Sequence, residues 1–169
     1  MPNTISISIK APSECTNSEI HEFCCFIEAG GEVSPGGLRS RIRNNAVSLI
    51  FLIFESKLAG VAAVKKPNEN YRNTIFDKAG VPGLAIDYKF EIGWVFVPTI
   101  YRGMKFSHSL IHAALSRIGD QNVFATSRID NDPMRRTLER HGFKKVGMAY
   151  VSERGNYNLN LFLHDAKTT

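Results

Sequence analysis

The feature that most constrains this chain is a short, almost wholly apolar segment, Val47–Phe54, made largely of residues that favour β-strands. A strand of this composition is apolar on both faces, so it has to be covered on both sides, as a central strand between helices is. The polar turn Glu55–Lys57 and the apolar segment Leu58–Val64 follow it and predict a β-hairpin. The apolar run is far shorter than the roughly 20 residues that span a bilayer, so we expect no membrane segment.

Periodicity in the rest of the chain places further elements on both sides of this hairpin. Thr4–Ile9 alternates isoleucine with serine, as a half-buried strand does, and a helix capped near Thr16 or Ser18 and ended by Gly30-Gly31 follows it. The inward face of that helix is expected to carry Ile20, Phe23, Cys24 and Ile27. The remaining predicted elements are, in chain order, a basic helix over about Pro35–Asn44, a long loop with a helical turn over Lys66–Leu84, a strand over Ile86–Val97, a helix over about Met104–Ile118, a strand over Asn122–Thr126, a helix capped by Asp132 before Pro133 and ended by Gly142, and a hairpin of Phe143–Val151 with Tyr157–Leu163. The order β-αα-βββ-α-β-α-ββ predicts a mixed α/β sheet with helices on its faces.

Length and composition set broader limits. The 169 residues, of which 43% are hydrophobic and 22% charged, fit one domain that spans residues 1–169 and has one core. The N-terminal segment has no positively charged opening followed by a continuous apolar stretch, so we expect a cytoplasmic protein. The formal net charge of +5 favours anionic partners, and a phosphate-bearing cofactor, an RNA and a solvated surface all fit it.

Cysteines and histidines carry weaker signals. Cys15, Cys24 and Cys25 lack the spacing of metal ligands, and we expect reduced thiols with Cys24 or Cys25 on the buried side of a helix. His108 and His112 have the i, i+4 spacing of two zinc ligands, but the residues between them lack the glutamate of a zinc protease motif. We therefore expect no metal site.

The segment Ile86–Val97 alternates so cleanly that its two faces can be assigned. One predicted face carries Ile86, Tyr88, Phe90, Ile92, Trp94 and Phe96, and the other carries Asp87, Lys89, Glu91, Gly93, Val95 and Val97. We expect the first face to be core. On the second face a single carboxylate, Glu91, stands beside Gly93, a residue without a side chain. Close backbone approach by a ligand explains such a glycine, and so does a bulge or a packing requirement.

A tight basic turn after this strand, Val97–His108, opens a helix. The first backbone N–H groups of a helix lack intrahelical partners, and the helix dipole adds partial positive charge there. The segment is therefore a physically sensible site for an anion, although every helix has an N-terminus and this alone identifies no ligand.

The same segment resembles the cofactor motif of the GNAT superfamily of acyl-CoA N-acyltransferases, in which an apolar strand leads to an (R/Q)xxGx(G/A) turn that opens a helix. A second match begins at Ser127, where Asn131 opens a helix that ends in Gly142-Phe143, with Gly147 soon after. The predicted element order is similar to that of the family over nearly the whole chain. The resemblance implies a GNAT-like, mostly antiparallel sheet and acetyl-CoA as cosubstrate.

What the resemblance implies for individual residues is specific. The backbone of Val95–Val97 would pair with the pantetheine arm and supply an N–H to the oxyanion, and the turn amides would wrap the pyrophosphate. Glu91 coincides with a position at which some members carry a general base. The family's general acid toward the leaving thiolate is absent from its usual position, so this role is either unnecessary or taken elsewhere; Tyr150 and Tyr157 are candidates for it, and each also fits a core or rim aromatic. The cofactor-binding residues implied in this way are Val95, Phe96, Val97, Arg102, Gly103, Met104, Lys105, Phe106, Ser107, His108 and Asn131.

The resemblance favours direct transfer of an acetyl group from acetyl-CoA to a primary amine that lies between Glu91, the early helices and the 66–84 loop. A protein amine or an aminoacyl-tRNA is an alternative acceptor. Lys105 and Ser107 stand where the family usually has glycine or alanine, and Leu138 stands where many members have tyrosine. These departures leave open a catalytically inactive module that binds acyl-CoA or nucleic acid. An exposed final strand would allow a homodimer.

Overall fold

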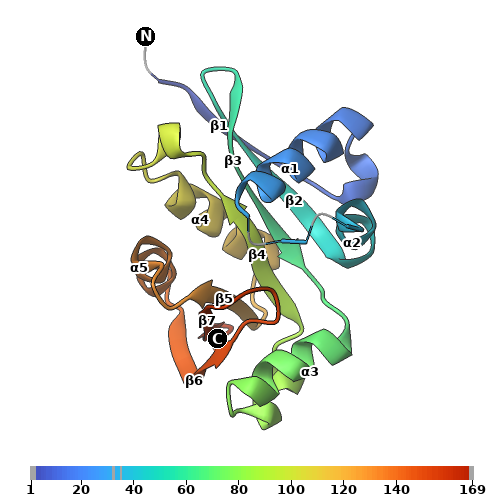
Figure 1. Cartoon of the computed structure of the whole chain (residues 1–169). Helices are drawn as coiled ribbons and strands as arrows, with labels where there is room; N and C mark the ends of the chain where they lie inside the picture. The colour runs from blue at the N-terminus through green and yellow to red at the C-terminus, as the bar shows by residue number, and fades with distance from the viewer. Residues whose placement is uncertain (1–2, 32, 35, 168–169) are drawn as a thin grey trace.

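The computed structural model describes residues 3–31, 33–34 and 36–167, and within these ranges seven strands form one sheet (Figure 1). The spatial order is β1-β2-β3-β4-β5-β7-β6. Among these strands β4 and β5 run parallel, and the other neighbours are antiparallel. The predicted mixed, mostly antiparallel sheet is confirmed. The strands are β1 (Ile5–Lys10), β2 (Ala46–Phe54), β3 (Lys57–Lys65), β4 (Phe90–Phe96), β5 (Val123–Arg128), β6 (Lys144–Val151) and β7 (Asn158–His164).

Helices cover both faces of this sheet (Figure 1). One face is covered by α4 (Phe106–Ile118) and α5 (Asp132–Arg140), and the other by α1 (Asn17–Ala29), α2 (Leu38–Asn45) and α3 (Glu69–Lys78). The apolar strand β2 contributes to both layers, because its alternate residues belong to the core under α4 and to the core under α1. The prediction of a central strand covered on both sides is therefore confirmed.

The first helix forms as its sequence predicts. Thr16 is the N-cap, and its hydroxyl accepts a hydrogen bond of 3.1 Å from the amide of Glu19, while the amide of Thr16 donates to the Glu19 carboxylate at 2.8 Å. The helix ends at Gly30, and all four residues predicted to face inward are buried. Cys24 is among them, and the three cysteines form no disulfide. The second helix begins at Leu38, and Pro35, its predicted start, lies outside the described residues.

The segment Lys66–Leu84, predicted as a long loop with a helical turn, instead contains the ten-residue helix α3, so the prediction is right only in that part of it is helical. The side chain of Asn68 caps the helix by accepting a hydrogen bond of 2.8 Å from the amide of Tyr71. Ile75 and Phe76 are buried on its inner side, against the part of the sheet that β5 and β7 form. The polar and glycine-rich composition concealed a short apolar stripe, which becomes helical once it has a sheet to pack on.

The strand predicted over Ile86–Val97 is shorter and less regular than its alternation indicates. Residues 82–87 form a 3₁₀ turn, so β4 begins at Phe90. Within β4 the pairing with β3 shifts register and Trp94 has a φ of 50°, which together define a β-bulge. The bulge turns Trp94 and Phe96 toward α1, while Ile92 and Val95 pack in the core under α4. The predicted common face of Ile92, Trp94 and Phe96 is therefore wrong.

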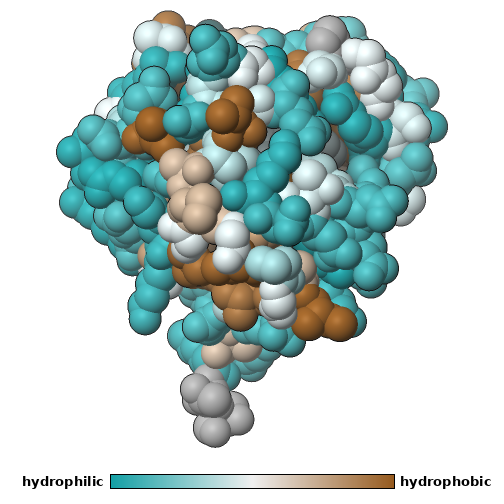
Figure 2. All heavy atoms as spheres, turned by 60° about the horizontal axis from the view of Figure 1, so that its bottom comes forward, coloured by the Kyte–Doolittle hydropathy of each residue, from teal (hydrophilic) through white to brown (hydrophobic). Residues whose placement is uncertain are grey.

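The other predicted elements agree with the observed ones to within two residues at each end. One further expectation is wrong: β7 is not exposed, because it lies between β5 and β6 and pairs with both. A homodimer through that strand is therefore unsupported. Figure 2 shows the face that includes the α3 side of the molecule to be mainly hydrophilic, with apolar residues in small separate groups. Among the described helices, none has both the length and the hydrophobicity needed to cross a membrane.

Candidate active site

The parallel strands β4 and β5 separate after only two pairs of residues. Phe90 pairs with Val123 and Glu91 pairs with Phe124, and beyond these the ladder between the two strands ends. β4 continues in pairing with β3 on its other side, and β5 continues in pairing with β7. A cavity of about 1180 Å³ opens where the two strands diverge, and both strands line it. Its walls reach α4 and α5 on one face of the sheet and α1 and α3 on the other.

One end of this cavity is formed by the turn that precedes α4. Gly103 and Lys105 both have left-handed backbone conformations, with φ of 82° and 62°, and α4 begins at Phe106. The amides of residues 103–107 donate to no backbone carbonyl of the described chain, whereas the amides of His108 and Ser109 donate to the carbonyl of Lys105. Successive open amides at a helix N-terminus form a concave site for an anion such as a pyrophosphate.

Lys105 occupies a position at which the resembling family usually has glycine. Its left-handed conformation explains that preference, since a residue with a Cβ adopts it at a cost of about 1 kcal/mol or more. The chain keeps the turn geometry despite the lysine, and the lysine adds a positive charge beside the open amides. At Gly103 an added Cβ would meet no atom within 4 Å, so that position needs glycine for its backbone angle alone.

Four cationic residues line this end of the cavity: Arg102, Lys105, Arg136 and Arg140. The two arginines on α5 were not predicted as site residues. Their i, i+4 spacing could have identified them. It places both arginines on one side of a helix that begins beside the predicted anion site. A polyphosphate bound here would meet positive charge from two separate elements.

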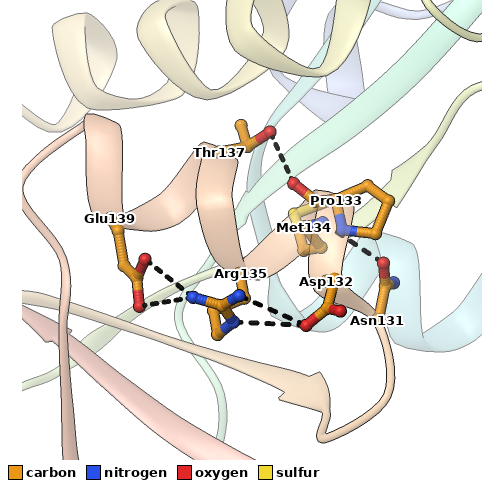
Figure 3. Close-up of polar contacts among 7 residues, drawn as sticks. All are labelled: Asn131, Asp132, Pro133, Met134, Arg135, Thr137 and Glu139. Atoms are coloured by element: carbon orange, nitrogen blue, oxygen red, sulfur yellow. Dashed lines mark hydrogen bonds and ion pairs between the residues drawn. The ribbon is translucent and has the colours of Figure 1, made fainter.

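Asn131 has a structural role at the start of α5, which Figure 3 shows. Its side-chain oxygen accepts a hydrogen bond of 3.2 Å from the amide of Met134, so the N-cap is Asn131 and not Asp132 as predicted. Asn131 still lines the cavity, and its side-chain amide group has two N–H donors. Leu138 stands at the position where many family members carry a tyrosine that acts as general acid. It is 1% exposed and lies in the core.

Figure 3 also shows how the two sides of α5 differ. Arg135 lies between Asp132 and Glu139, at 3.3 and 3.1 Å, on the outer side of the helix. On another side the hydroxyl of Thr137 donates to the carbonyl of Pro133 at 2.9 Å. The same hydroxyl lies 3.4 Å from a ring nitrogen of His108. This contact joins α5 to the first turn of α4 and so fixes the shape of the anion end.

The other end of the cavity is built around Glu91. This carboxylate is 3% exposed, and its Oε2 lies 2.9 Å from the Nζ of Lys65, which is itself 8% exposed. Its Oε1 accepts a long hydrogen bond of 3.4 Å from the hydroxyl of Tyr71. The Lys65 ammonium also lies 4.6 Å from the centre of the Trp94 ring. The predicted base is thus a buried carboxylate in an ion pair, flanked by aromatic rings.

Gly93 has a clear structural reason in this arrangement. A Cβ at Gly93 would lie 3.2 Å from the Nζ of Lys65 and 3.4 Å from the Oε1 of Glu91. The glycine therefore makes room for the Lys65–Glu91 pair. Of the three explanations that the sequence left open, the packing requirement is met here, and the register shift of the β-bulge also begins at this residue.

Two tyrosine hydroxyls adjoin the carboxylate. Burial raises the pKa of Tyr150, and the charge of Glu91 raises it further; the same two causes hold the pKa of Tyr71 well above its usual range. Both phenols are therefore protonated at neutral pH. The Tyr150 hydroxyl has no hydrogen-bond partner among the described residues, although Tyr150 is 8% exposed and lines the cavity. Tyr157, the alternative acid, stacks on the guanidinium of Arg128 at 3.7 Å.

The structure brings the predicted site residues together along one cavity, with one exception. Met104 is 38% exposed and does not line it. Phe106 packs its ring against Phe54, so it can serve the site only through its backbone amide. Lys65 and Tyr71 were missed. Lys65 directly follows the apolar run Leu58–Val64, which is a visible signal, whereas Tyr71 lies in the segment predicted as a loop. Among the described residues, no three histidine, cysteine or acidic side chains gather as metal ligands do.

The sequence was compared with protein-family models and with curated proteins. The chain matches no protein-family model, and it matches no curated protein. Comparison of the structure finds many solved proteins of similar fold. An acyl-CoA N-acyltransferase from Pseudomonas aeruginosa superposes with a TM-score of 0.65 at 14% identity, over 95% of this chain and 99% of that one.

Two further structures cover the chain equally well. They are yncA from Salmonella typhimurium with its cofactor acetyl-CoA, with a TM-score of 0.66 at 12% identity over 98% and 96% of the chains, and Ard1 from Thermoplasma volcanium, with 0.67 at 16% over 97% and 99%. Identities this low establish the fold alone. The GNAT-like fold that the sequence resemblance implies is confirmed.

Proposed function

We propose that this chain is an N-acetyltransferase that transfers an acetyl group from acetyl-CoA to a primary amine. One observation carries the proposal: a single cavity runs from the open amides of residues 103–107, through the gap between β4 and β5, to the buried carboxylate of Glu91. A long, thin cosubstrate with a polyphosphate at one end and a thioester at the other fits such a path. The similarity in fold to yncA, solved with acetyl-CoA, supports the same cosubstrate.

The chain's own residues would hold this cosubstrate at three places. The amides of residues 103–107 and the cations Arg102, Lys105, Arg136 and Arg140 would bind the phosphates. The edge of β4 over Val95–Val97, which β5 leaves unpaired, would hydrogen-bond the pantetheine amides, together with the side-chain N–H donors of Asn131. A backbone N–H of that edge would stabilise the oxyanion as the thioester carbonyl becomes tetrahedral.

Glu91 and Tyr150 would carry the proton transfers. The amine nitrogen must lose a proton to attack, and the Oε1 of Glu91, directly or through one water, would accept it because Oε2 is held by Lys65. A C–N bond forms, the C–S bond breaks, and the thiolate takes a proton from Tyr150, whose phenol is protonated and has no hydrogen-bond partner among the described residues. The transfer is direct, with no acyl-enzyme.

The test combines binding with turnover. Calorimetry should show saturable binding of acetyl-CoA, and release of free CoA should depend on an added primary amine. Glu91→Gln should lower kcat by about 10²-fold or more, the effect typical of a lost general base, while the Kd for acetyl-CoA changes little. Glu153→Gln is the matched control, since Glu153 is a cavity-lining carboxylate paired with Lys78 at 2.8 Å. Equal activity of wild type and Glu91→Gln would remove Glu91 from the mechanism.

A second candidate function is a module that binds acetyl-CoA without catalysis. The burial of Leu138 at the position of the family's usual acid favours it, because the acid role would then be vacant. Binding of acetyl-CoA without turnover of any amine would support this alternative. The same turnover assay can be run with a protein amine or an aminoacyl-tRNA as the acceptor. A steep dependence of RNA binding on salt concentration would support the aminoacyl-tRNA. A cytoplasmic location stays a prediction.

A further inference from the structure

The acceptor end of the cavity offers an incoming amine a single carboxylate oxygen. The Oε2 of Glu91 is taken by Lys65 at 2.9 Å, and the Oε1 has only the long contact of 3.4 Å with Tyr71. One ammonium group can therefore be received at Oε1. A second positive charge on the same acceptor would find no second open oxygen on this carboxylate.

The neighbour of that oxygen is a buried cation. Lys65 is 8% exposed and lines the cavity, and its ammonium, which has three N–H donors, lies 2.9 Å from the Oε2 of Glu91 as an ion pair. Aromatic rings flank it, with the centre of Trp94 at 4.6 Å and that of Tyr71 at 5.7 Å. In such a water-poor environment a second ammonium is strongly repelled, whereas a carboxylate or phosphonate is attracted.

The walls of the acceptor end add to this preference. Four cationic residues line it: Lys65, Lys78, Arg128 and Arg154. The carboxylates Glu91 and Glu153 are in ion pairs with lysines, and the two arginines have further contacts within the chain. Over the whole cavity eight lysine and arginine residues face three carboxylates, of which Asp130 is the third, so the field favours an acceptor with negative charge.

We infer that the acceptor is a zwitterion, a primary amine that carries a carboxylate or phosphonate group close to its nitrogen, as an amino acid or an aminophosphonate does. The nitrogen lies at the Oε1 of Glu91 and the acid group at the ammonium of Lys65. Lys65 thereby excludes diamines and polyamines, whose second ammonium would occupy the place of the acid group. This inference rests on the proposed acetyl transfer and narrows its substrate class.

Trp94 provides a direct readout, because it is the only tryptophan of the chain and lies against Lys65. In the presence of saturating CoA, its fluorescence is titrated with two probes of similar size, N-acetyl-β-alanine and N-acetylethylenediamine. The anionic probe should half-saturate at a concentration at least about tenfold lower than the cationic one. Equal half-saturation, or tighter binding of the cation, overturns the inference.

Variants assign the preference to Lys65. Lys65→Met should abolish it and Lys65→Arg should keep it, while Lys66→Met, which removes the exposed neighbouring charge, should leave it unchanged. If Lys65→Met does not fold, the double variant Lys65→Met/Glu91→Gln, which leaves no buried charge unpaired, is titrated in its place and should also lose the preference. An anion preference that survives in whichever of these variants folds overturns the role of Lys65.

Turnover distinguishes this inference from the function on which it rests. In wild type, kcat/KM should fall in the order β-alanine, ethanolamine, ethylenediamine. If ethylenediamine is the best acceptor, acetyl transfer stands and the zwitterion is refuted. If acetyl-CoA does not bind, the proposed function fails, and the Trp94 titration, repeated without CoA, still reports whether the acceptor end prefers an anion.

Discussion

Replacing Lys65 with methionine shortens the side chain by one atom but keeps it unbranched, removes its charge and leaves the Glu91 carboxylate buried without its partner. Glu91 is 3% exposed and Lys65 8% exposed, and their charged atoms lie 2.9 Å apart, so little solvent can compensate for the loss. Removing one partner of a buried pair costs about 3–5 kcal/mol. That is a large part of the roughly 5–15 kcal/mol that stabilises a domain. We expect Tm to fall on the order of 10 °C.

The assay is urea unfolding, followed by circular dichroism, of wild type, Lys65→Met, Glu91→Gln and the double variant. Because the double variant leaves no charge uncompensated, it should cost less than the sum of the single variants by about 2 kcal/mol or more. Lys78→Met is the control: it breaks an ion pair whose Glu153 side chain is 71% exposed, and should change stability by less than about 1 kcal/mol. A loss below about 1 kcal/mol for Lys65→Met, or additive single effects, would refute the account of a buried, coupled pair.

Two further predictions concern the other end of the cavity and its surroundings. Lys105→Gly should be more stable to urea than Lys105→Ala by about 1 kcal/mol, because glycine adopts the left-handed turn without strain. Equal stability of the two variants would contradict the strain. Calorimetry should find that both variants bind acetyl-CoA more weakly than wild type, because both lose the charge of the lysine. Burial lowers the pKa of His141 below its usual 6.5, and the charges of His108, His112 and His164 lower it further. At a pH between the folded and the unfolded pKa of His141, the unfolded chain binds more protons than the folded one. The contribution of His141 to the free energy of unfolding is therefore complete above pH 6.5 and is lost as the pH falls. Tm should therefore drop from pH 7.5 to 5.5, and drop less in His141→Gln; identical slopes would exclude His141 as the cause.

Much of the fold could be predicted from local sequence. The capping box of Thr16 and Glu19 marks the start of α1, and the apolar run in β2 requires a sheet covered on both sides. The open amides of the turn before α4 could be predicted because unpaired amides at a helix start depend only on neighbouring residues. Helix α3 could not be predicted, since its short apolar stripe is helical only against the core under β5 and β7.

The sequence by itself determined most of the strands and helices, α3 and the start of β4 excepted, and the turn that leaves amides open at the start of α4, since hydrogen bonds and side-chain periodicity within a few residues decide these. Only the tertiary structure decided the face to which Trp94 turns, because the bulge arises from the register of β4 against β3. It also decided that Glu91 is an ion-paired carboxylate, since Lys65 lies 26 positions earlier in the sequence and reaches it across paired strands. Contacts between strands depend on how the whole sheet is assembled, and no local pattern encodes them.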